Sequence, residues 1–226
     1  MQERKTEVIF LNSDLIAVYK EKGLPTVPLK RNPEGDSLYK RIAASYPEVS
    51  VVHGMNEWEG GIIHRLDTAT SGIVLCARSD EAYRELIEAQ KRDEIEKHYL
   101  ASTTERETTL PGFEDFPYSF SGREMEIRSY FRPYGGKGAS VRPVLSKSRH
   151  ISGALYTTEV MRTSDQGVFE CVIRRGFRHQ IRCHLAWSGH PITGDDRYGG
   201  MENDKLLLEA VRITFPYKGK ILTIEV

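Results

Sequence analysis

The sequence predicts an α+β protein with a mostly antiparallel, mixed central sheet flanked by helices. Short runs rich in β-branched residues alternate with turn residues along most of the chain, a pattern typical of strands. Only two or three segments have helical spacing, too few for a wound α/β sheet in which helices alternate with strands. A chain of 226 residues suffices for a substantial core, and we expect residues 1–226 to form a single domain.

The N-terminal part predicts a hairpin followed by a helix. Residues 8–19 contain two apolar runs around an Asn-Ser-Asp turn, which favours two antiparallel strands. A loop rich in Gly and Pro follows at 20–28. Residues 36–46 have helical spacing, with Asp36 or Ser37 as the N-cap and Pro47 after the end.

A second helix is predicted after Ser79 and Asp80, which precede an amphipathic run that extends to about residue 94. Further strands are predicted at 95–101, 154–162 and 167–174. Residues 105–150 mix charges with Pro and Gly and have no clear periodicity, so no element is assigned there.

The composition is that of an ordinary soluble protein, with 39% hydrophobic and 28% charged residues. No apolar stretch approaches the roughly 20 residues of a membrane span, and the N-terminus lacks the apolar core of a signal peptide. The cysteines Cys76, Cys171 and Cys183 lie in apolar contexts without a C-x-x-C pair. We therefore expect buried, reduced thiols and a cytoplasmic protein.

The charges are unevenly distributed although the net charge is zero. Residues 1–120 contain 15 Lys and Arg against 21 Asp and Glu, whereas residues 121–226 contain 17 against 11. The positive excess is sharpest at 123–150 and 174–184. A local basic face, and with it an RNA partner, is compatible with the neutral total.

The most informative stretch lies between two apolar runs, residues 61–63 and 73–77, that predict buried strands. It reads HRLDTATSG over residues 64–72. A carboxylate at such a place leaves water only when an opposite charge pairs with it. Asp67 is therefore the structural partner of a buried arginine, the working group of a site, or both.

HRLDTATSG resembles the signature of the RluA-type pseudouridine synthases, which carry His-Arg-Leu-Asp, two variable residues and Thr-Ser-Gly. Residues 174–186 (RRGFRHQIRCHLA) resemble a second motif of this family, and residues 189–199 (GHPITGDDRYG) resemble its continuation. KEKGLP at 20–25 and KHYLA at 97–101 are similar to two shorter elements. The resemblance implies the pseudouridine synthase fold, a catalytic cleft across the sheet, and a catalytic domain without a separate N-terminal RNA-binding module.

This family converts uridine in RNA into pseudouridine by breaking the N1–C1′ bond, turning the flipped base and rejoining it through C5. The resemblance implies that Asp67 acts on the sugar, either by adding to C1′ or by abstracting a sugar proton, and both roles need the ionised form. We expect Arg182 to form the ion pair that keeps Asp67 charged. Tyr99 is expected to stack on the target base and to serve the later deprotonation of C5.

The resemblance also predicts substrate contacts. Arg65 is expected to fill the space that the flipped nucleotide leaves. The remaining substrate-binding residues that the motifs imply are His64, Arg178, His179 and Gln180. Judged from the residues alone, structural hydrogen bonds are favoured for His64, His179 and His184, and a turn-forming role for Asp195.

Two positions depart from the family pattern. Phe177-Arg178 stands where the family has Arg-Thr or Arg-Ser, and Arg175 or Arg178 is a candidate to replace the missing contact. Glu209 stands where members often carry His.

Three other functions remain open from the sequence. An RNA-binding protein without catalysis on the same fold is one. A metal-dependent hydrolase is the second, built from His179, His184, His190, Asp195 and Asp196, but these residues lack a usual zinc spacing. A glycosidase is disfavoured because it needs two facing carboxylates. We expect a monomer that acts on rRNA or tRNA with no cofactor and no metal.

Overall fold

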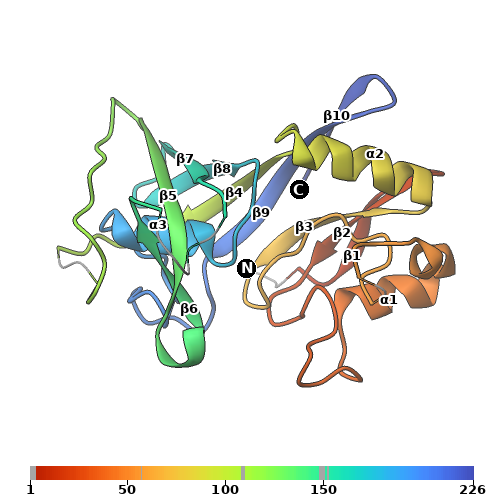
Figure 1. Ribbon diagram of the computed structural model, residues 1–226, viewed down its shortest axis with the longest axis horizontal. Coiled ribbons are helices and arrows are strands. Elements are labelled where there is room, and N and C mark those ends of the chain that lie inside the picture. The colour runs from red at the N-terminus through yellow and green to blue at the C-terminus, as the bar shows by residue number, and fades with distance from the viewer. Residues whose placement is uncertain (1–3, 57, 108–109, 148–150, 152) are drawn as a thin grey trace. The chain divides into compact units, whose positions relative to one another are not determined.

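Two units, each with its own antiparallel strands, make up the fold of this computed structural model (Figure 1). The first contains Met1–Lys97 and Glu209–Val226, and the second contains His98–Leu208. The structure describes residues 4–56, 58–107, 110–147, 151 and 153–226. These residues include ten strands and three α-helices. The α+β class and the mostly antiparallel, mixed sheet are confirmed, while the single catalytic domain and the cleft across the sheet stay predictions.

The first unit contains an open sheet in which β1, β2, β3 and β9 follow one another and β10 pairs with β9. The β3–β9 pair is parallel, and the others in this unit are antiparallel. The strands are β1 (Glu7–Leu11), β2 (Leu15–Lys20), β3 (Ser71–Ala77), β9 (Leu208–Tyr217) and β10 (Lys220–Glu225). Every residue of β2 and β3 is buried, as expected for strands that are covered on both faces.

The predicted hairpin at 8–19 is confirmed. Asn12 closes the turn between β1 and β2, because its Oδ1 accepts hydrogen bonds from the backbone N–H groups of Asp14 and Leu15. Such a local side-chain bond replaces the ladder bonds that the turn interrupts.

Both predicted helices of the first unit are confirmed, and each begins at a serine cap. Ser37 accepts a hydrogen bond from Lys40 N, and Ser79 accepts one from Ala82 N; such caps satisfy backbone donors that have no partner inside the helix. The helices are α1 (Leu38–Ser45) and α2 (Asp80–Lys91), and a 3-10 helix, η1 (Pro47–Val51), follows α1.

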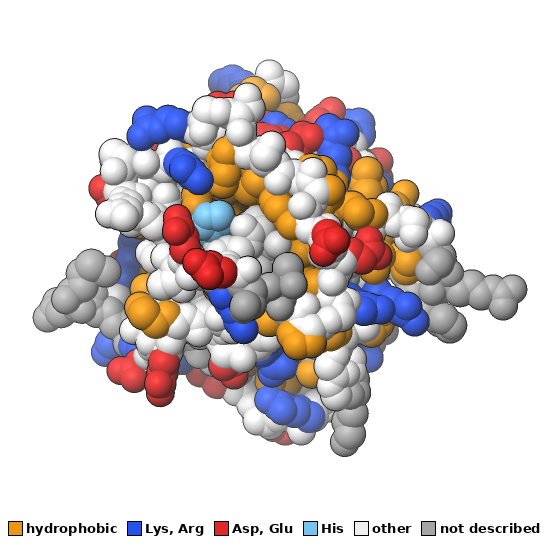
Figure 2. All heavy atoms as spheres, turned by 90° about the vertical axis from the view of Figure 1, so that its left-hand side faces the viewer, with side chains coloured by type: hydrophobic (Ala, Val, Ile, Leu, Met, Phe, Trp, Pro, Cys, Tyr) orange, Lys and Arg blue, Asp and Glu red, His pale blue; other side chains and the backbone are white. Residues whose placement is uncertain are grey.

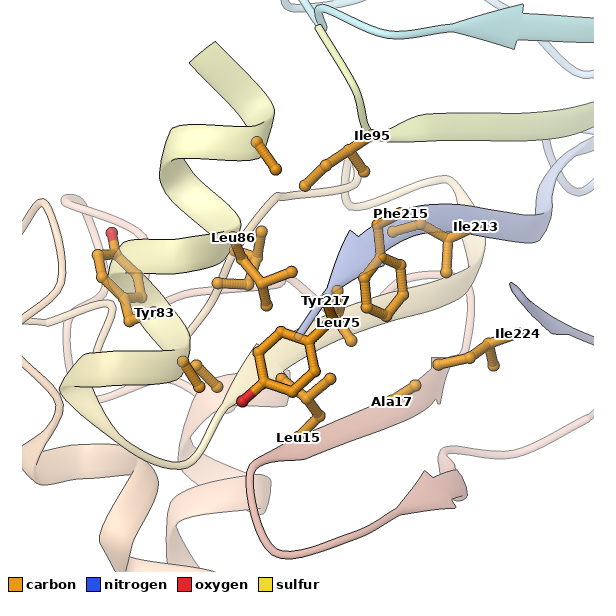
Figure 3. Packing of buried hydrophobic residues seen from close by; sticks show 14 of the residues in the cluster. Leu15, Ala17, Leu75, Tyr83, Leu86, Ile95, Ile213, Phe215, Tyr217 and Ile224 are labelled. Carbon is orange, nitrogen blue, oxygen red and sulfur yellow. The ribbon is translucent and has the colours of Figure 1, made fainter. Parts of the chain in front are cut away.

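The core of the first unit lies between α2 and the sheet (Figure 3). Leu86 of α2 points towards Leu75 of β3 and Phe215 of β9, and Tyr83 belongs to the same buried cluster. Burial of one such side chain stabilises a fold by about 1.5–3 kcal/mol. The helix α2 therefore holds β3, which is the strand into which the HRLDTATSG segment leads.

The second unit has the strand order β4, β8, β7, β5 and β6, and the pairs β8–β7, β7–β5 and β5–β6 are antiparallel. Its elements are β4 (Glu96–Ser102), β5 (Glu124–Tyr134), the 3-10 helix η2 (Gly136–Gly138), β6 (Ser140–Val144), β7 (Tyr156–Arg162), β8 (Val168–Ile173) and α3 (Gln180–Trp187). The helix α3 packs against β6 and β7. The strands predicted at 95–101, 154–162 and 167–174 are confirmed.

Residues 105–150, to which the sequence analysis assigned no element, contain β5 and β6. Along β5 the buried side chains Met125, Ile127 and Phe131 alternate with exposed ones, a period of two that is visible in EMEIRSYF. The segment before β5 is not a strand but is fixed by aromatic contacts: Phe116 and Tyr118 both pack edge-on against Trp187.

The prediction of buried, reduced cysteines is confirmed, since Cys76, Cys171 and Cys183 are free and buried. Among the described residues, no helix is long and apolar enough to cross a membrane.

Candidate active site

Asp67 lies on a turn that leads into β3. The turn is closed by a hydrogen bond from Thr70 N to the carbonyl oxygen of Asp67, at 3.0 Å. Asp67 is partly exposed, whereas its neighbour Leu66 and the residues from Thr70 onward are buried. The carboxylate therefore stands at the edge of the core, with access to solvent and to a substrate.

Backbone groups of Leu66 and Thr68, the two residues next to Asp67, are bonded to the segment that follows β2. Thr26 Oγ1 donates to the carbonyl oxygen of Leu66 at 2.9 Å and accepts from Leu66 N at 3.1 Å. Gly23 N donates to the carbonyl oxygen of Thr68 at 2.8 Å. We call these contacts, which involve residues 20–26, the clamp. The clamp fixes the backbone direction from which the Asp67 side chain projects.

Lys20, the last residue of β2, completes the clamp. It is fully buried, and its Nζ donates to the carbonyl oxygens of Glu21 (2.9 Å), Leu24 (2.8 Å) and Thr68 (3.4 Å). Burial lowers the pKa of Lys20 to about 8, although the negative charges of Asp67 and Glu21 oppose this shift. The Lys20 ammonium is therefore close enough to the Asp67 carboxylate for the two charges to interact.

The start of β3 is held close to β9. A Cβ added at Gly72, which has φ +118°, would lie 2.2 Å from Ala210 O, so only glycine fits this approach. One residue earlier in β9, Glu209 accepts a hydrogen bond from the Tyr19 hydroxyl at 2.6 Å. Burial and this carboxylate raise the pKa of Tyr19 to about 12. At the position where relatives often carry His, Glu209 thus fastens β9 to β2.

His64 is a structural residue in this geometry. Its Nε2 accepts a hydrogen bond from Leu75 N at 3.3 Å, and burial lowers its pKa to about 3, with a smaller effect from Lys97. The expected structural hydrogen bond is therefore present. Nδ1 of His64 is buried without a hydrogen-bond partner in the described part of the chain. The substrate contact of His64 stays a prediction.

Arg65 points away from the core. Its side chain is 60% exposed, and Nη1 forms an ion pair with Glu59 Oε1 at 2.6 Å. An exposed cation in the signature turn suits the predicted contact with RNA, which remains a prediction.

Arg182 and Asp195 form a bidentate ion pair in the second unit. Arg182 Nε lies 2.7 Å from Asp195 Oδ2, and Nη2 lies 2.8 Å from Oδ1. Asp195 Oδ1 also accepts from the backbone N–H groups of Arg197 and Tyr198, which confirms the predicted turn-forming role. The predicted pairing of Arg182 with Asp67, a residue of the first unit, stays a prediction.

Tyr99 lies on β4 and is 5% exposed. Its stacking on a base stays a prediction, because burial of a strand aromatic is also the ordinary packing arrangement.

The residues of the RHQIR segment have mainly structural bonds within the second unit. His179 Nδ1 lies 3.2 Å from the Tyr198 hydroxyl, and His179 has a left-handed backbone at the start of α3. Gln180 accepts from Phe177 N and donates to Thr157 O. These contacts hold the entry into α3, from which Arg182 projects, and a direct substrate contact of either side chain stays a prediction.

His184 is fully buried and lies between two hydroxyl groups. Ser129 Oγ is 2.8 Å from its Nε2, and Thr158 Oγ1 is 2.8 Å from its Nδ1. Burial lowers the pKa of His184 to about 3. The neutral ring therefore links β5, β7 and α3, and the structural hydrogen bonding expected for His184 is confirmed.

The departure at Phe177-Arg178 serves packing. Phe177 stacks on Phe131 with ring centroids 4.9 Å apart, and it also contacts Tyr156. Arg178 Nη2 donates to the carbonyl oxygens of Gly138 (2.7 Å) and Ser140 (3.1 Å). Arg178 thus fixes the turn between β5 and β6, and its predicted contact with RNA remains a prediction.

Among the described residues, no group of three or more His, Cys, Asp or Glu side chains could hold a metal ion. The histidines and carboxylate of the hydrolase hypothesis are instead hydrogen-bonded as described for His179, His184 and Asp195.

The charge excess of the second half does not form one continuous basic patch on the face in Figure 2. Lys and Arg side chains are scattered there among acidic and hydrophobic ones. Electrostatic attraction of RNA by this face is therefore local.

Comparison with known proteins identifies the family. The model of the RNA pseudouridylate synthase family matches residues 14–187, which is more than half of the chain. Among solved structures, human RNA pseudouridylate synthase domain containing 1 superposes with a TM-score of 0.68 at 17% identity, over 98% of this chain and 83% of that one. This likeness shows the fold.

Two curated relatives specify the branch. The dual-specificity RNA pseudouridine synthase RluA of Vibrio vulnificus is 28% identical over 214 residues, which are 93% of this chain and 77% of that protein. The ribosomal large subunit pseudouridine synthase D of Yersinia pestis is 28% identical over 201 residues, which are 88% of this chain and 54% of that protein. The chain thus spans about half of the second relative.

The chain belongs to the RNA pseudouridylate synthase family and is an isomerase of the RluA type. The sequence motifs therefore identified the family correctly. The motifs did not assign roles to the clamp residues Lys20, Gly23 and Thr26. The sequence did contain one indication for Lys20, because a lysine stands at the end of an otherwise apolar strand.

Proposed function

We propose that this chain isomerises specific uridines of rRNA or tRNA to pseudouridine, with Asp67 as the catalytic carboxylate. The N1–C1′ bond breaks, the base turns, C5 bonds to C1′, the C5 proton leaves and N1 gains a proton. The isomerisation leaves the composition unchanged, so the scheme consumes no oxidant, reductant or co-substrate, and we propose that it uses no cofactor. Asp67 acts on the sugar as nucleophile at C1′ or as base.

The clamp around Asp67 is the observation that carries this proposal. Thr26 fixes the peptide before Asp67, and Gly23 and Lys20 bond to the carbonyl oxygen of the next residue, Thr68. A carboxylate that is partly exposed, yet carried by an anchored backbone, is preorganised for reaction with a bound substrate.

Two residues of the second unit complete the mechanism that we propose. Arg182 supplies a cation to Asp67 while it remains bonded to Asp195, because a guanidinium has donors for more than one carboxylate. Tyr99 stacks on the flipped base, and its hydroxyl assists removal of the C5 proton. Arg65, which carries an exposed guanidinium, takes the place of the flipped nucleotide in the RNA stack.

The names of two relatives support the substrate class that we propose. One is named for dual specificity and one for the ribosomal large subunit, which supports rRNA or tRNA as the partner of this chain. We further propose that the protein acts as a cytoplasmic monomer; the buried, free cysteines suit a reducing compartment.

Tritium release tests the proposal. Cellular RNA labelled at uridine C5 is incubated with wild-type protein, Asp67→Asn and a matched control, Asp195→Asn, in the presence of chelator. We expect release by wild type, none by Asp67→Asn, and residual release by Asp195→Asn, which retains the turn-forming oxygen. Equal release by wild type and Asp67→Asn would exclude Asp67 as the catalytic group.

The same assay separates the alternative function, an RNA-binding protein without catalysis. That protein binds labelled RNA, measured by filter retention, and releases no tritium from free RNA or from assembled ribosomal particles.

A further inference from the structure

Three exposed apolar side chains belong to the short segment before the signature turn. Val51 is 71% exposed, Met55 76% and Trp58 50%. We call these three side chains the apolar ledge. Large apolar groups are usually removed from water, so their exposure on one short segment makes it a candidate interaction site.

The backbone at Met55 is attached to α2. His53 N donates to Asp80 Oδ1 at 2.7 Å, and Met55 N donates to the Tyr83 hydroxyl at 2.9 Å. Further along the chain, Glu59 N donates to Asn56 O at 3.0 Å. Anchoring of this kind reduces the entropy that is lost when a partner binds.

The ledge is also joined to the signature turn. Glu59, next to Trp58 in the chain, receives hydrogen bonds from Asn56 Nδ2 and from Arg65 Nη1. The residue that follows Trp58 in the chain is thus bonded to the exposed guanidinium of the turn that carries Asp67.

The charges around the ledge are mixed. Glu48 forms an ion pair with Arg78 at 2.6 Å, and Glu59 forms one with Arg65. Asp80 Oδ2 lies 2.8 Å from His53 Nδ1. The Arg65 guanidinium, which is 60% exposed, is the cation of this region that can contact a phosphate.

We propose that the apolar ledge binds an unpaired base of the RNA substrate, with the Trp58 indole as the stacking platform beside Arg65. Aromatic side chains bind single-stranded RNA in this way because every base has a π-face. The inference rests on the proposed function, since it assigns a further contact to the same RNA. It adds a substrate feature, an unpaired nucleotide outside the target uridine.

Affinity measurements test the ledge with a short single-stranded oligouridylate and an RNA duplex of the same length as probes. We expect Trp58→Ala to weaken binding of the single strand about tenfold, and Trp58→Phe to weaken it much less. The duplex is expected to be unaffected. The control Ile221→Ala removes a side chain that is equally exposed (70%) in the turn region of β10, and it should change neither affinity.

The salt dependence gives a second criterion. Stacking releases no counterions, so Trp58→Ala should lower affinity by the same factor at every salt concentration and leave the slope of log K against log salt unchanged. A changed slope would mean that the substitution disturbs phosphate contacts, and the stacking role would be rejected.

Fluorescence locates the contact, because the sequence has two tryptophans and Trp187 is buried. Oligouridylate should quench the emission of wild type and leave that of Trp58→Phe, which reports Trp187, unchanged. The inference would be overturned if Trp58→Ala bound the oligouridylate as tightly as wild type, or if sedimentation showed that the ledge only mediates self-association. Tritium release by wild type would still support the proposed function in either case. Absence of both RNA binding and tritium release would count against the proposed function itself.

Discussion

Arg182 and Asp195 form a bidentate ion pair in which the side chains are only 6% and 0% exposed. The pair is complete without any substrate, since Nε and Nη2 of Arg182 each meet one carboxylate oxygen. Asp195 in turn holds the backbone at Arg197 and Tyr198. Because the ion pair fixes the guanidinium, the Arg182 side chain has little conformational freedom. A rigid cation suits the role proposed for Arg182, which is to orient the Asp67 carboxylate.

Replacing Arg182 should reduce stability and activity together. Arg182→Met leaves Asp195 buried without its cation, and such a loss costs about 3–5 kcal/mol. Urea denaturation measures the change. In the double variant Arg182→Met/Asp195→Asn we expect most of the stability to return while tritium release stays low, since the cation proposed for Asp67 is still missing. Recovery of activity in the double variant would contradict a role of Arg182 beyond structure.

The clamp predicts an effect of Thr26 on turnover. Thr26→Val keeps the shape of the side chain but removes both hydrogen bonds to Leu66, each worth about 1 kcal/mol. We expect a modest loss of stability and a fall in kcat of about tenfold or more, because Asp67 loses its fixed direction. Thr26→Ser retains the hydroxyl and should keep near-normal kcat. If valine and serine variants have equal kcat, the clamp does not position Asp67.

Gly72 predicts a strong steric effect. In Gly72→Ala the new Cβ would lie 2.2 Å from Ala210 O with φ at +118°, so β3 and β9 must separate. We expect a loss of roughly 3 kcal/mol or more in the free energy of unfolding, in the range of other severe core substitutions. Gly122→Ala is the control: it has φ +61° but nothing within 4 Å, and should cost only about 1–2 kcal/mol. Equal losses in the two variants would show that contact with β9 is unimportant.

The buried His184 predicts acid sensitivity. Its pKa is about 3 in the folded protein and near 6.5 when unfolded, so below pH 6.5 the unfolded state binds a proton that the folded state does not. This contribution to stability is complete above about pH 6.5 and falls by up to about 1.4 kcal/mol per pH unit as pH decreases towards 3. NMR provides the direct check. The imidazole resonances of His184 should not move between pH 7.5 and 5, and a midpoint inside that range would refute the prediction.

Local structure was predictable in part from the sequence: the strand predicted at 61–63 was wrong, since Ile62 forms only an isolated bridge with Cys76, and β5 and β6 were not assigned. The correct predictions include the hairpin at 8–19, the serine caps of α1 and α2 and the strand containing Tyr99. These elements depend on residues that are close in the chain. Asn12 and Ser79, for example, bond to backbone groups a few residues away. The HRLDTATSG and RHQIR motifs likewise identified the family, because each is a contiguous run of residues.

The tertiary structure alone decided which distant groups meet. Thr26 bonds to Leu66, Lys20 to Thr68, and Tyr19 to Glu209, and no pattern along the chain specifies these partners. The partner of Arg182 is Asp195 for the same reason: a buried guanidinium takes whichever carboxylate the packing of α3 brings within reach. The spacing of residues in the sequence predicts hydrogen bonds between groups a few residues apart. The environment of a charged side chain depends instead on burial and on contacts that form only when the whole unit folds.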